Sequence, residues 1–173
     1  AVPLLLPLAA GPDRIAAIEA VRALGRIGDP AAAPALLTLI QAPKGDPVLR
    51  VEAASAIGGV GGAGVFDALI DILSDRDPLV RAAVLRSLAA VDREGFMLTL
   101  SALDPDPDWS VRAALASVLG SLSPESALPR LRTMMSDADQ RVVAAALASL
   151  ARLGPPDAAD LLLNGVPATG VSG

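Results

Sequence analysis

Asp77-Pro-Leu-Val-Arg-Ala-Ala-Val-Leu-Arg-Ser-Leu88 is a stretch that returns, with changes, along the whole chain. Related stretches begin 31 residues later at Asp108, another 31 later at Asp139, and 31 earlier at Asp46. A fifth copy begins at Asp13, 33 residues before Asp46. A nearly fixed period of this length is typical of a repeat array in which every repeat is one supersecondary unit.

Each copy has the pattern of an amphipathic helix, which we call helix B. Apolar residues stand 3, 7 and 11 positions after the Asp, as Val80, Val84 and Leu88 do, and this spacing follows one face of an α-helix. The Asp at the start is a good N-cap, because its carboxylate accepts hydrogen bonds from the first backbone N–H groups. Since glycine commonly ends helices, the sequence predicts helix ends at Gly25, Gly58, Gly120 and Gly154.

A less regular helix A is expected before each Asp. The predicted ranges are 31–40, 65–73, 95–103 and 126–135, with Pro34 and Pro129 near two of the starts. The opening residues 1–10 resemble the apolar core of a signal peptide. Leu5 and Leu8, however, precede Asp13 by the same distances as Leu69 and Ile72 precede Asp77. We therefore interpret residues 1–10 as a truncated first helix, and the chain as a fragment of something longer. Residues 156–163 are expected to begin a sixth helix A.

The motif Asp-x-x-Val-Arg-x-x-Ala-x-x-x-Leu in the second helix of a 31-residue pair resembles HEAT repeats, including the short bacterial form named from phycobilisome-lyase subunits. The best copies begin at Asp77 and Asp108, whereas Ala17 and Val143 replace the Arg in the first and last repeats. The resemblance implies an all-α, right-handed α-solenoid of antiparallel helix pairs, with B helices on the concave side. We expect a single HEAT-like domain over 1–165, with repeats near 1–27, 28–60, 61–91, 92–122 and 123–154, a half-repeat at 155–165, and a mobile tail at 166–173.

Composition narrows the classes of function. The chain is 53% hydrophobic but only 2% aromatic, so its core must consist of Ala, Leu, Val and Ile. A net charge of -5 disfavours a nucleic-acid partner. Apolar runs fall short of the roughly 18 residues that cross a bilayer, so no membrane partner is expected and a cytoplasmic location is favoured.

An Asp/Arg ladder recurs along the B helices, with each Arg four residues after its Asp. Its positions are Asp46, Arg50, Asp77, Arg81, Asp108, Arg112 and Asp139. The guanidinium row is a candidate site for a phosphate or carboxylate ligand. The family resemblance implies instead that each Arg pairs with the Asp of an adjacent repeat, and each Arg comes with its own carboxylate.

Two further motifs imitate ligand sites. Asp104, Asp106 and Asp108 begin like an EF-hand loop, but Trp109 and Leu115 stand where that loop needs Gly and Glu. A weak cation site or an acidic rim remains an alternative to helix capping. Residues 59–64 match G-x-G-x-x-G, but they follow a helix where a dinucleotide site requires a strand. The sequence therefore predicts neither a metal nor a cofactor.

The outward face of helix B is the most informative candidate site. It reads as a shallow groove of small and apolar residues with scattered Arg, and exposed apolar patches often mark interaction sites. The predicted partner-binding residues are Ile15, Ile18, Arg22, Val48, Val51, Leu79, Ala82, Arg86, Trp109 and Ala113. The alternatives are that neighbouring B helices cover this face, and that Trp109 only packs over an adjacent loop.

The sequence contains few side chains that could act in catalysis. The chain has no His, Cys or Tyr, and its only Lys, Lys44, falls in a loop. The sequence thus predicts a non-catalytic protein-interaction scaffold that binds a protein or peptide along the concave B-helix face. Alternatives implied by the resemblance are an accessory or spacer domain of a larger enzyme, such as a peptidyl-prolyl isomerase, and a chromophore-lyase-type subunit. The uncapped apolar faces at 4–8 and 161–163 also predict end-to-end self-association.

Overall fold

Residues 1–154 are described by the structure, a computed structural model of the 173-residue chain. Within this part there are ten α-helices, one short 3₁₀ helix and no strands, as expected for an all-α protein. The helices form two compact units, one spanning residues 1–104 and one starting at Pro105. We call them unit 1 and unit 2 and describe each by itself. The prediction of a single domain over 1–165 stays a prediction.

The five B helices all begin directly after the expected Asp. Unit 1 contains α2 (Arg14–Ile27), α4 (Pro47–Val60) and α6 (Pro78–Val91), and unit 2 contains α8 (Trp109–Leu119) and α10 (Gln140–Leu153). The carboxylate of each preceding Asp accepts one or two backbone N–H groups of the first turn, at 2.8–3.1 Å. The predicted N-caps are therefore confirmed in all five repeats.

The A helices are close to their expected ranges. They are α1 (Val2–Ala9), α3 (Ala33–Gln41) preceded by the 3₁₀ helix η1 (Pro30–Ala32), α5 (Val65–Ile72), α7 (Arg93–Ser101) and α9 (Pro124–Met134). Pro129 lies inside α9 and not near its start, because Pro124 begins the helix earlier. The predicted sixth helix at 156–163, the half-repeat and the tail lie outside the described residues.

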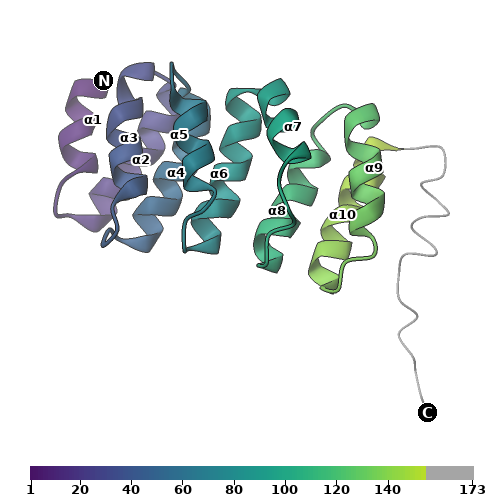
Figure 1. Cartoon of the computed structure of the whole chain (residues 1–173). Helices are drawn as coiled ribbons and strands as arrows, with labels where there is room; N and C mark the ends of the chain where they lie inside the picture. The colour runs from purple at the N-terminus through teal and green to yellow at the C-terminus, as the bar shows by residue number, and fades with distance from the viewer. Residues whose placement is uncertain (155–173) are drawn as a thin grey trace, which may run out of the picture. The chain divides into compact units, whose positions relative to one another are not determined.

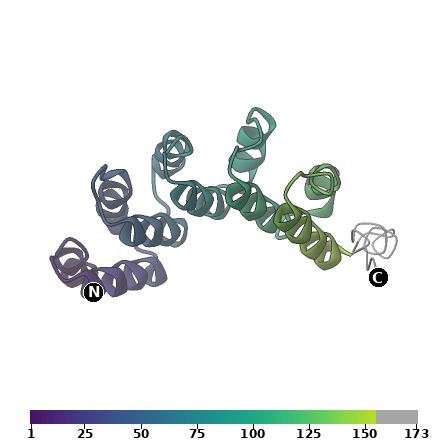
Figure 2. The same ribbon diagram turned by 90° about the horizontal axis from the view of Figure 1, so that it is seen from below.

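Within unit 1 the helices form two rows (Figure 1). The B helices α2, α4 and α6 form the inner row of a curve and α1, α3, α5 and α7 the outer row, as Figure 2 shows from below. In unit 2, α10 packs against both α8 and α9. The residues eleven positions after each Asp are completely buried, and they are Leu24, Ile57, Leu88, Leu119 and Leu150. The predicted core stripe is thus confirmed at this position in both units.

Two of the predicted helix ends are wrong. Gly25 and Gly58 lie inside α2 and α4, which end instead at Gly28 and Gly61, both with positive φ. A Cβ on Gly25 would lie 2.9 Å from the Cα of Ala56 in the next B helix. Gly25 is therefore needed for the close packing of α2 on α4, a tertiary reason that the local sequence does not reveal. The ends at Gly120 and Gly154 are confirmed.

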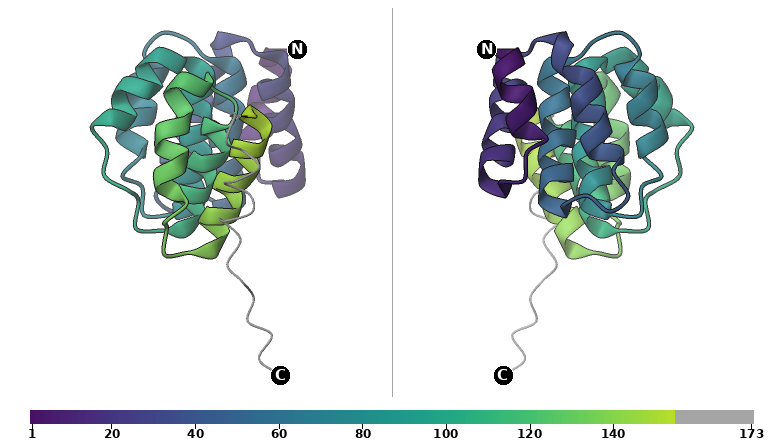
Figure 3. Two further views of the ribbon diagram at one scale, coloured as in Figure 1. Left: turned by 90° about the vertical axis from the view of Figure 1, so that its right-hand side faces the viewer. Right: turned by 90° about the vertical axis from the view of Figure 1, so that its left-hand side faces the viewer.

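The first helix of unit 1 has an uncovered side. Figure 3, in its right-hand panel, looks onto α1, and its residues Leu4 and Leu8 are 77% and 50% exposed. End-to-end association through this face stays a prediction, and its counterpart at 161–163 lies outside the described residues. No helix of the described part is long and apolar enough to cross a membrane.

Candidate functional site

The turns before α6, α8 and α10 are built by pairs of acidic residues. In unit 1, the carboxylate of Asp75 accepts the N–H of Asp77 at 2.9 Å. In unit 2, the carboxylate of Asp137 accepts the N–H of Asp139 at 2.8 Å. The first acid of each pair thus shapes the turn, while the second acid caps the helix that follows.

Two of the ladder arginines, Arg50 and Arg112, pair with the first acid of the next repeat. Arg50 forms an ion pair with Asp75 and also donates to the carbonyl oxygen of Ile40 at 2.8 Å. Arg112 donates to both carboxylate oxygens of Asp137, at 2.7 and 2.9 Å. Pairing with an adjacent repeat was predicted, but the acid that receives the bond is not the capping Asp assigned to the ladder.

The capping acids Asp46 and Asp139 do not receive the ladder arginines, because their carboxylates already accept hydrogen bonds from the first turns of the B helices. Asp46 caps α4 and forms an ion pair with Arg14 of α2 at 2.6 Å. Asp139 caps α10 and holds Arg141 at 2.7 Å. The hydrogen bond from Arg14 lowers the pKa of Asp46. These acids therefore remain ionised and bound within the fold near neutral pH.

The pKa values of the ladder acids follow from these contacts. The hydrogen bond from Arg112 is the largest cause that lowers the pKa of Asp137. For Asp75, burial opposes ionisation, but the hydrogen bonds from Arg50 and from the N–H of Asp77 lower the pKa overall. Arg50 is only 5% exposed. Arg50 and Arg112 are thus structural groups and not an open anion site.

One signal in the sequence could have identified the true partners. In the first repeat, Ala17 stands where the ladder has an Arg. In the second repeat, Lys44 stands where later repeats have the first acid of the pair. Both members of one ion pair are missing together, as expected if they contact each other. The capping Asp46 is retained at the same place, because its task is a different one.

The two segments that resemble an EF-hand loop and a dinucleotide-binding motif have structural roles. Within the described residues, no group of three acidic side chains is placed to hold a metal ion. The G-x-G-x-x-G match connects the end of α4 to α5, and Gly64 is the residue before α5. No strand precedes it in the described part of the chain, so this segment is an inter-repeat loop.

An exposed row of large apolar side chains crosses the B helices of unit 1. Ile15 on α2, Val48 on α4 and Leu79 on α6 stand two residues after their capping Asp, and they are 74%, 43% and 57% exposed. We call these three residues the apolar row. The equivalent positions in unit 2 are Ser110 and Arg141, so the apolar row belongs to unit 1.

The remaining predicted groove residues differ in exposure. Ile18 and Val51 are half-buried, and Arg86 is exposed. Ala82 is 4% exposed, so its assignment to the groove is wrong. Packing encloses this small side chain on α6, in agreement with the alternative that neighbouring helices cover part of this face.

Trp109 and Ala113 belong to unit 2 and are therefore described separately from the apolar row of unit 1. The guanidinium of Arg141 lies 3.5 Å from the centre of the Trp109 ring. The half-buried indole is therefore engaged in a cation–π contact inside unit 2.

Arg22, one of the predicted partner-binding residues, is held by two glutamates. Its guanidinium donates to Glu52 at 2.5 and 3.0 Å and to Glu19 at 2.8 Å. The hydrogen bond to Glu52, then that to Glu19, raises the pKa of Arg22 above its usual value. The same contact with Arg22 lowers the pKa of Glu52, although burial opposes it. Arg22 thus links α2 to α4.

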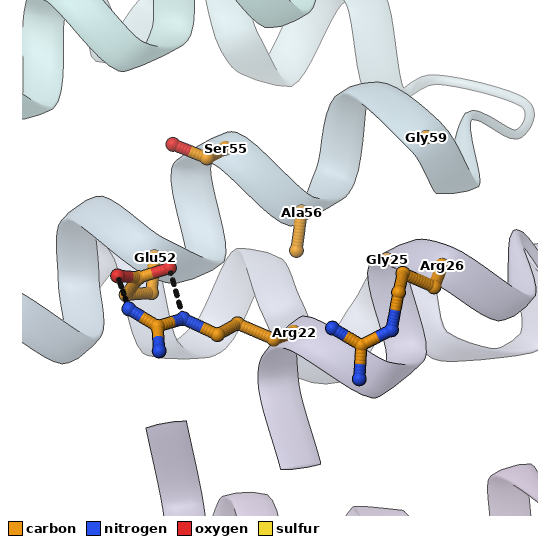
Figure 4. Close-up of a pocket in the computed structure, with 7 residues that line it drawn as sticks. All are labelled: Arg22, Gly25, Arg26, Glu52, Ser55, Ala56 and Gly59. Atoms are coloured by element: carbon orange, nitrogen blue, oxygen red, sulfur yellow. Dashed lines mark hydrogen bonds and ion pairs between the residues drawn. The ribbon is translucent and has the colours of Figure 1, made fainter. Parts of the chain in front are cut away.

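A hollow of about 260 Å³ lies next to this ion pair, between α2 and α4 (Figure 4). It is lined by Arg22, Gly25, Arg26, Glu52, Ser55, Ala56 and Gly59. The sequence reasoning did not identify Arg26, which stands in the last turn of α2. Within the described residues the Arg26 guanidinium has no hydrogen-bond or ion-pair partner, so the hollow contains an unpaired positive charge.

The repeat geometry agrees with the comparison to protein families. The HEAT-repeats family matches residues 38–95 and 97–169, and the PBS lyase HEAT-like repeat matches 16–42. The chain belongs to the HEAT-repeat family. Its fold is an α-solenoid of antiparallel helix pairs, with neighbouring helices packed in sequence within each unit.

Two solved structures match this chain. A chain from the complex of CpcE and CpcF of phycocyanin lyase from Nostoc is 23% identical, with a TM-score of 0.65, and the match covers 95% of this chain and 69% of that one. Human deoxyhypusine hydroxylase in complex with glycerol is 17% identical, with a TM-score of 0.49, over 97% and 78%. No curated protein is significantly similar in sequence.

Proposed function

We propose that the chain is a non-catalytic scaffold that binds a segment of a partner protein along the B-helix face of unit 1. The observation that carries this proposal is the apolar row. Three successive B helices present a large aliphatic side chain to solvent at the same repeat position. Because this exposure recurs at one repeat position in three helices, chance exposure of a single residue does not explain the series.

The energetics suit a binding surface. Complete burial of a Val, Leu or Ile side chain is worth about 1.5–3 kcal/mol. Three such side chains provide a few anchoring contacts, and ordering of the partner segment offsets part of this gain. The fixed spacing of α2, α4 and α6 prepares the three anchors before binding, which reduces the entropic cost on the scaffold side.

Two findings support an interaction role. HEAT-repeat arrays build extended surfaces from stacked helix pairs, and such surfaces commonly bind other proteins. The Nostoc structure is itself a complex of two proteins. The absence of His, Cys and Tyr from the sequence leaves few groups for catalysis, which favours binding as the function of this chain.

Site-specific photo-crosslinking tests the proposal. A photoreactive amino acid replaces Leu79 in one variant and Leu98, on α7, in a matched control. We expect Leu79 variants to capture a partner that Leu98 variants do not capture, and Ile15→Glu to abolish this capture. Leu98→Glu should have no effect, although Leu98 and Ile15 are both 74% exposed. Equal capture at the two positions, or capture that survives Ile15→Glu in a folded protein, would contradict the proposal.

A further inference from the structure

We propose that the hollow between α2 and α4 binds a carboxylate side chain of the partner segment, with the Arg26 guanidinium as the group that binds it. This inference rests on the proposed function and specifies the chemistry of the partner. It assigns a ligand to a site that contains an unpaired charge and lies on the same helices as two members of the apolar row.

The charges around the hollow leave one guanidinium available. Arg22 donates to both carboxylate oxygens of Glu52 and also to Glu19, so both glutamates beside the hollow are already paired with Arg22. Arg26 is exposed and unpaired among the described residues, although the chain has 19 acidic residues against 14 basic ones. Glu19, Arg22, Glu52 and Arg26 together carry two positive and two negative charges, so the distinguishing feature of the hollow is its one guanidinium without a partner among the described residues.

The floor of the hollow contains main chain and small side chains. The helices approach so closely that a Cβ on Gly59 would lie 2.6 Å from the carbonyl oxygen of Gly25. The hydroxyl of Ser55 is used as a donor to the carbonyl oxygen of Val51 at 3.0 Å. The floor thus provides little hydrogen bonding to an anion, and the C-terminal end of α2 carries a partial negative charge. An anion here must be bound by the Arg26 side chain.

A carboxylate fits these groups better than a phosphate. One planar guanidinium can bind one carboxylate through two parallel hydrogen bonds. A phosphate carries nearly two negative charges at neutral pH. It would meet a single unpaired guanidinium, the nearby Glu52 and a net protein charge of -5. We therefore assign the hollow to a Glu or Asp side chain, or to a terminal carboxylate, of a polypeptide.

The distance to the apolar row constrains the partner. Ile15 and Arg26 are 11 residues apart on α2, which corresponds to about 16 Å at 1.5 Å per residue. A partner that follows α2 would place its carboxylate about 11 residues from its apolar anchor if it is helical. If it is extended, the spacing is about five residues. The sequence of a captured partner can be checked for either spacing.

NMR of the arginine side chains tests the hollow without a partner. The Nε–Hε signals are followed while N-acetyl-glutamate α-amide, its glutamine analogue or inorganic phosphate is added at constant ionic strength. We expect a saturable shift of the Arg26 signal with the glutamate probe and none with the glutamine probe. Arg26→Gln should remove the response, and Arg93→Gln, at an exposed arginine on α7, should leave it unchanged. A uniform response of all arginines, or saturation by phosphate alone, would overturn the assignment.

The crosslinking experiment separates this inference from the proposed function. We expect Arg26→Gln to weaken the capture at position 79 about fivefold, as for an exposed ion pair. If Ile15→Glu abolishes capture while Arg26→Gln leaves it unchanged, the apolar row binds the partner and the carboxylate assignment is wrong. If neither variant changes capture, the proposed function itself is wrong.

Discussion

Arg112 on α8 holds both carboxylate oxygens of Asp137, at 2.7 and 2.9 Å, across 25 positions of the sequence. The two side chains are only 17% and 12% exposed. Arg112 also donates to the carbonyl oxygen of Asp106 at 2.8 Å, so one guanidinium joins the turn before α8 to the turn before α10. Such a pair should contribute measurably to the stability of unit 2.

Replacement of Asp137 by Asn should lower the free energy of unfolding by about 2 kcal/mol, because a charge-assisted pair is lost and Arg112 is left without its carboxylate. Chemical denaturation followed by circular dichroism measures this change. Glu19→Gln is the control, since the Glu19–Arg22 pair is exposed and its loss should be hard to detect. Equal effects of the two substitutions would contradict a structural role for the ladder.

The pH dependence of stability follows from the lowered pKa of Asp137. A carboxyl whose pKa is lower in the folded state than its usual value of 3.8 stabilises the fold at pH values above 3.8. This contribution is lost as the pH falls through the folded-state pKa. We expect stability to decrease below about pH 4, and the decrease to be smaller in Asp137→Asn. A variant with the same acid dependence as the original chain would show that other carboxyls dominate.

Gly25→Ala should destabilise the protein, although alanine is normally the better helix former by about 1 kcal/mol. The added Cβ would lie 2.9 Å from both the Cα and the Cβ of Ala56. We expect a loss of about 1–3 kcal/mol from overpacking. In a double-mutant cycle, Ala56→Gly should restore part of the loss. Strict additivity of the two changes would show that the helices do not meet at this point.

Two buried serines at the same repeat position should respond differently to replacement by Ala. The Ser87 hydroxyl donates to the carbonyl oxygen of Ala54 at 2.5 Å. The Ser149 hydroxyl is buried and has no hydrogen-bond partner among the described residues. Ser87→Ala should therefore lower the free energy of unfolding by about 1 kcal/mol, and Ser149→Ala should leave it unchanged or raise it. Thermal melts of the two variants compare them directly, and a larger loss for Ser149→Ala would show that its hydroxyl has a partner.

The single tryptophan should report on the Arg141 contact. The guanidinium lies over the ring of Trp109 and is held in place by Asp139. The hydrogen bond from Arg141 lowers the pKa of Asp139 to about 2, so this arrangement should persist down to about pH 3. Arg141→Gln should shift the emission maximum to longer wavelength by uncovering the indole. An unchanged spectrum would indicate that the guanidinium does not cover the ring in solution.

The fold was predictable because its determinants are local and periodic. A capping Asp, followed by apolar residues 3, 7 and 11 positions later, encodes both the start and the buried face of each B helix. The continuation of α2 through Gly25 and of α4 through Gly58 was not predictable in this way. At those positions glycine serves the packing between helices, and the pattern of a single helix does not contain that information.

The candidate site was predictable only in part. The sequence identified Ile15, Val48 and Leu79 because they share a repeat position, and the structure shows them exposed. The sequence could not show that Arg22 forms an ion pair with Glu52, because the two residues belong to different repeats and their contact depends on helix packing. For the same reason Arg26 was missed, since its lack of a partner is a property of its surroundings.

The connections between repeats also have a consequence for how the chain folds. The side-chain bonds between neighbouring repeats that are described above join residues 25 to 33 positions apart. Closing loops of this length has a moderate entropic cost, and no distant part of the sequence has to be found first. Folding can therefore begin in any pair of neighbouring repeats and extend by addition of one repeat at a time. During synthesis, the first repeats could reach their native contacts before the last ones have left the ribosome.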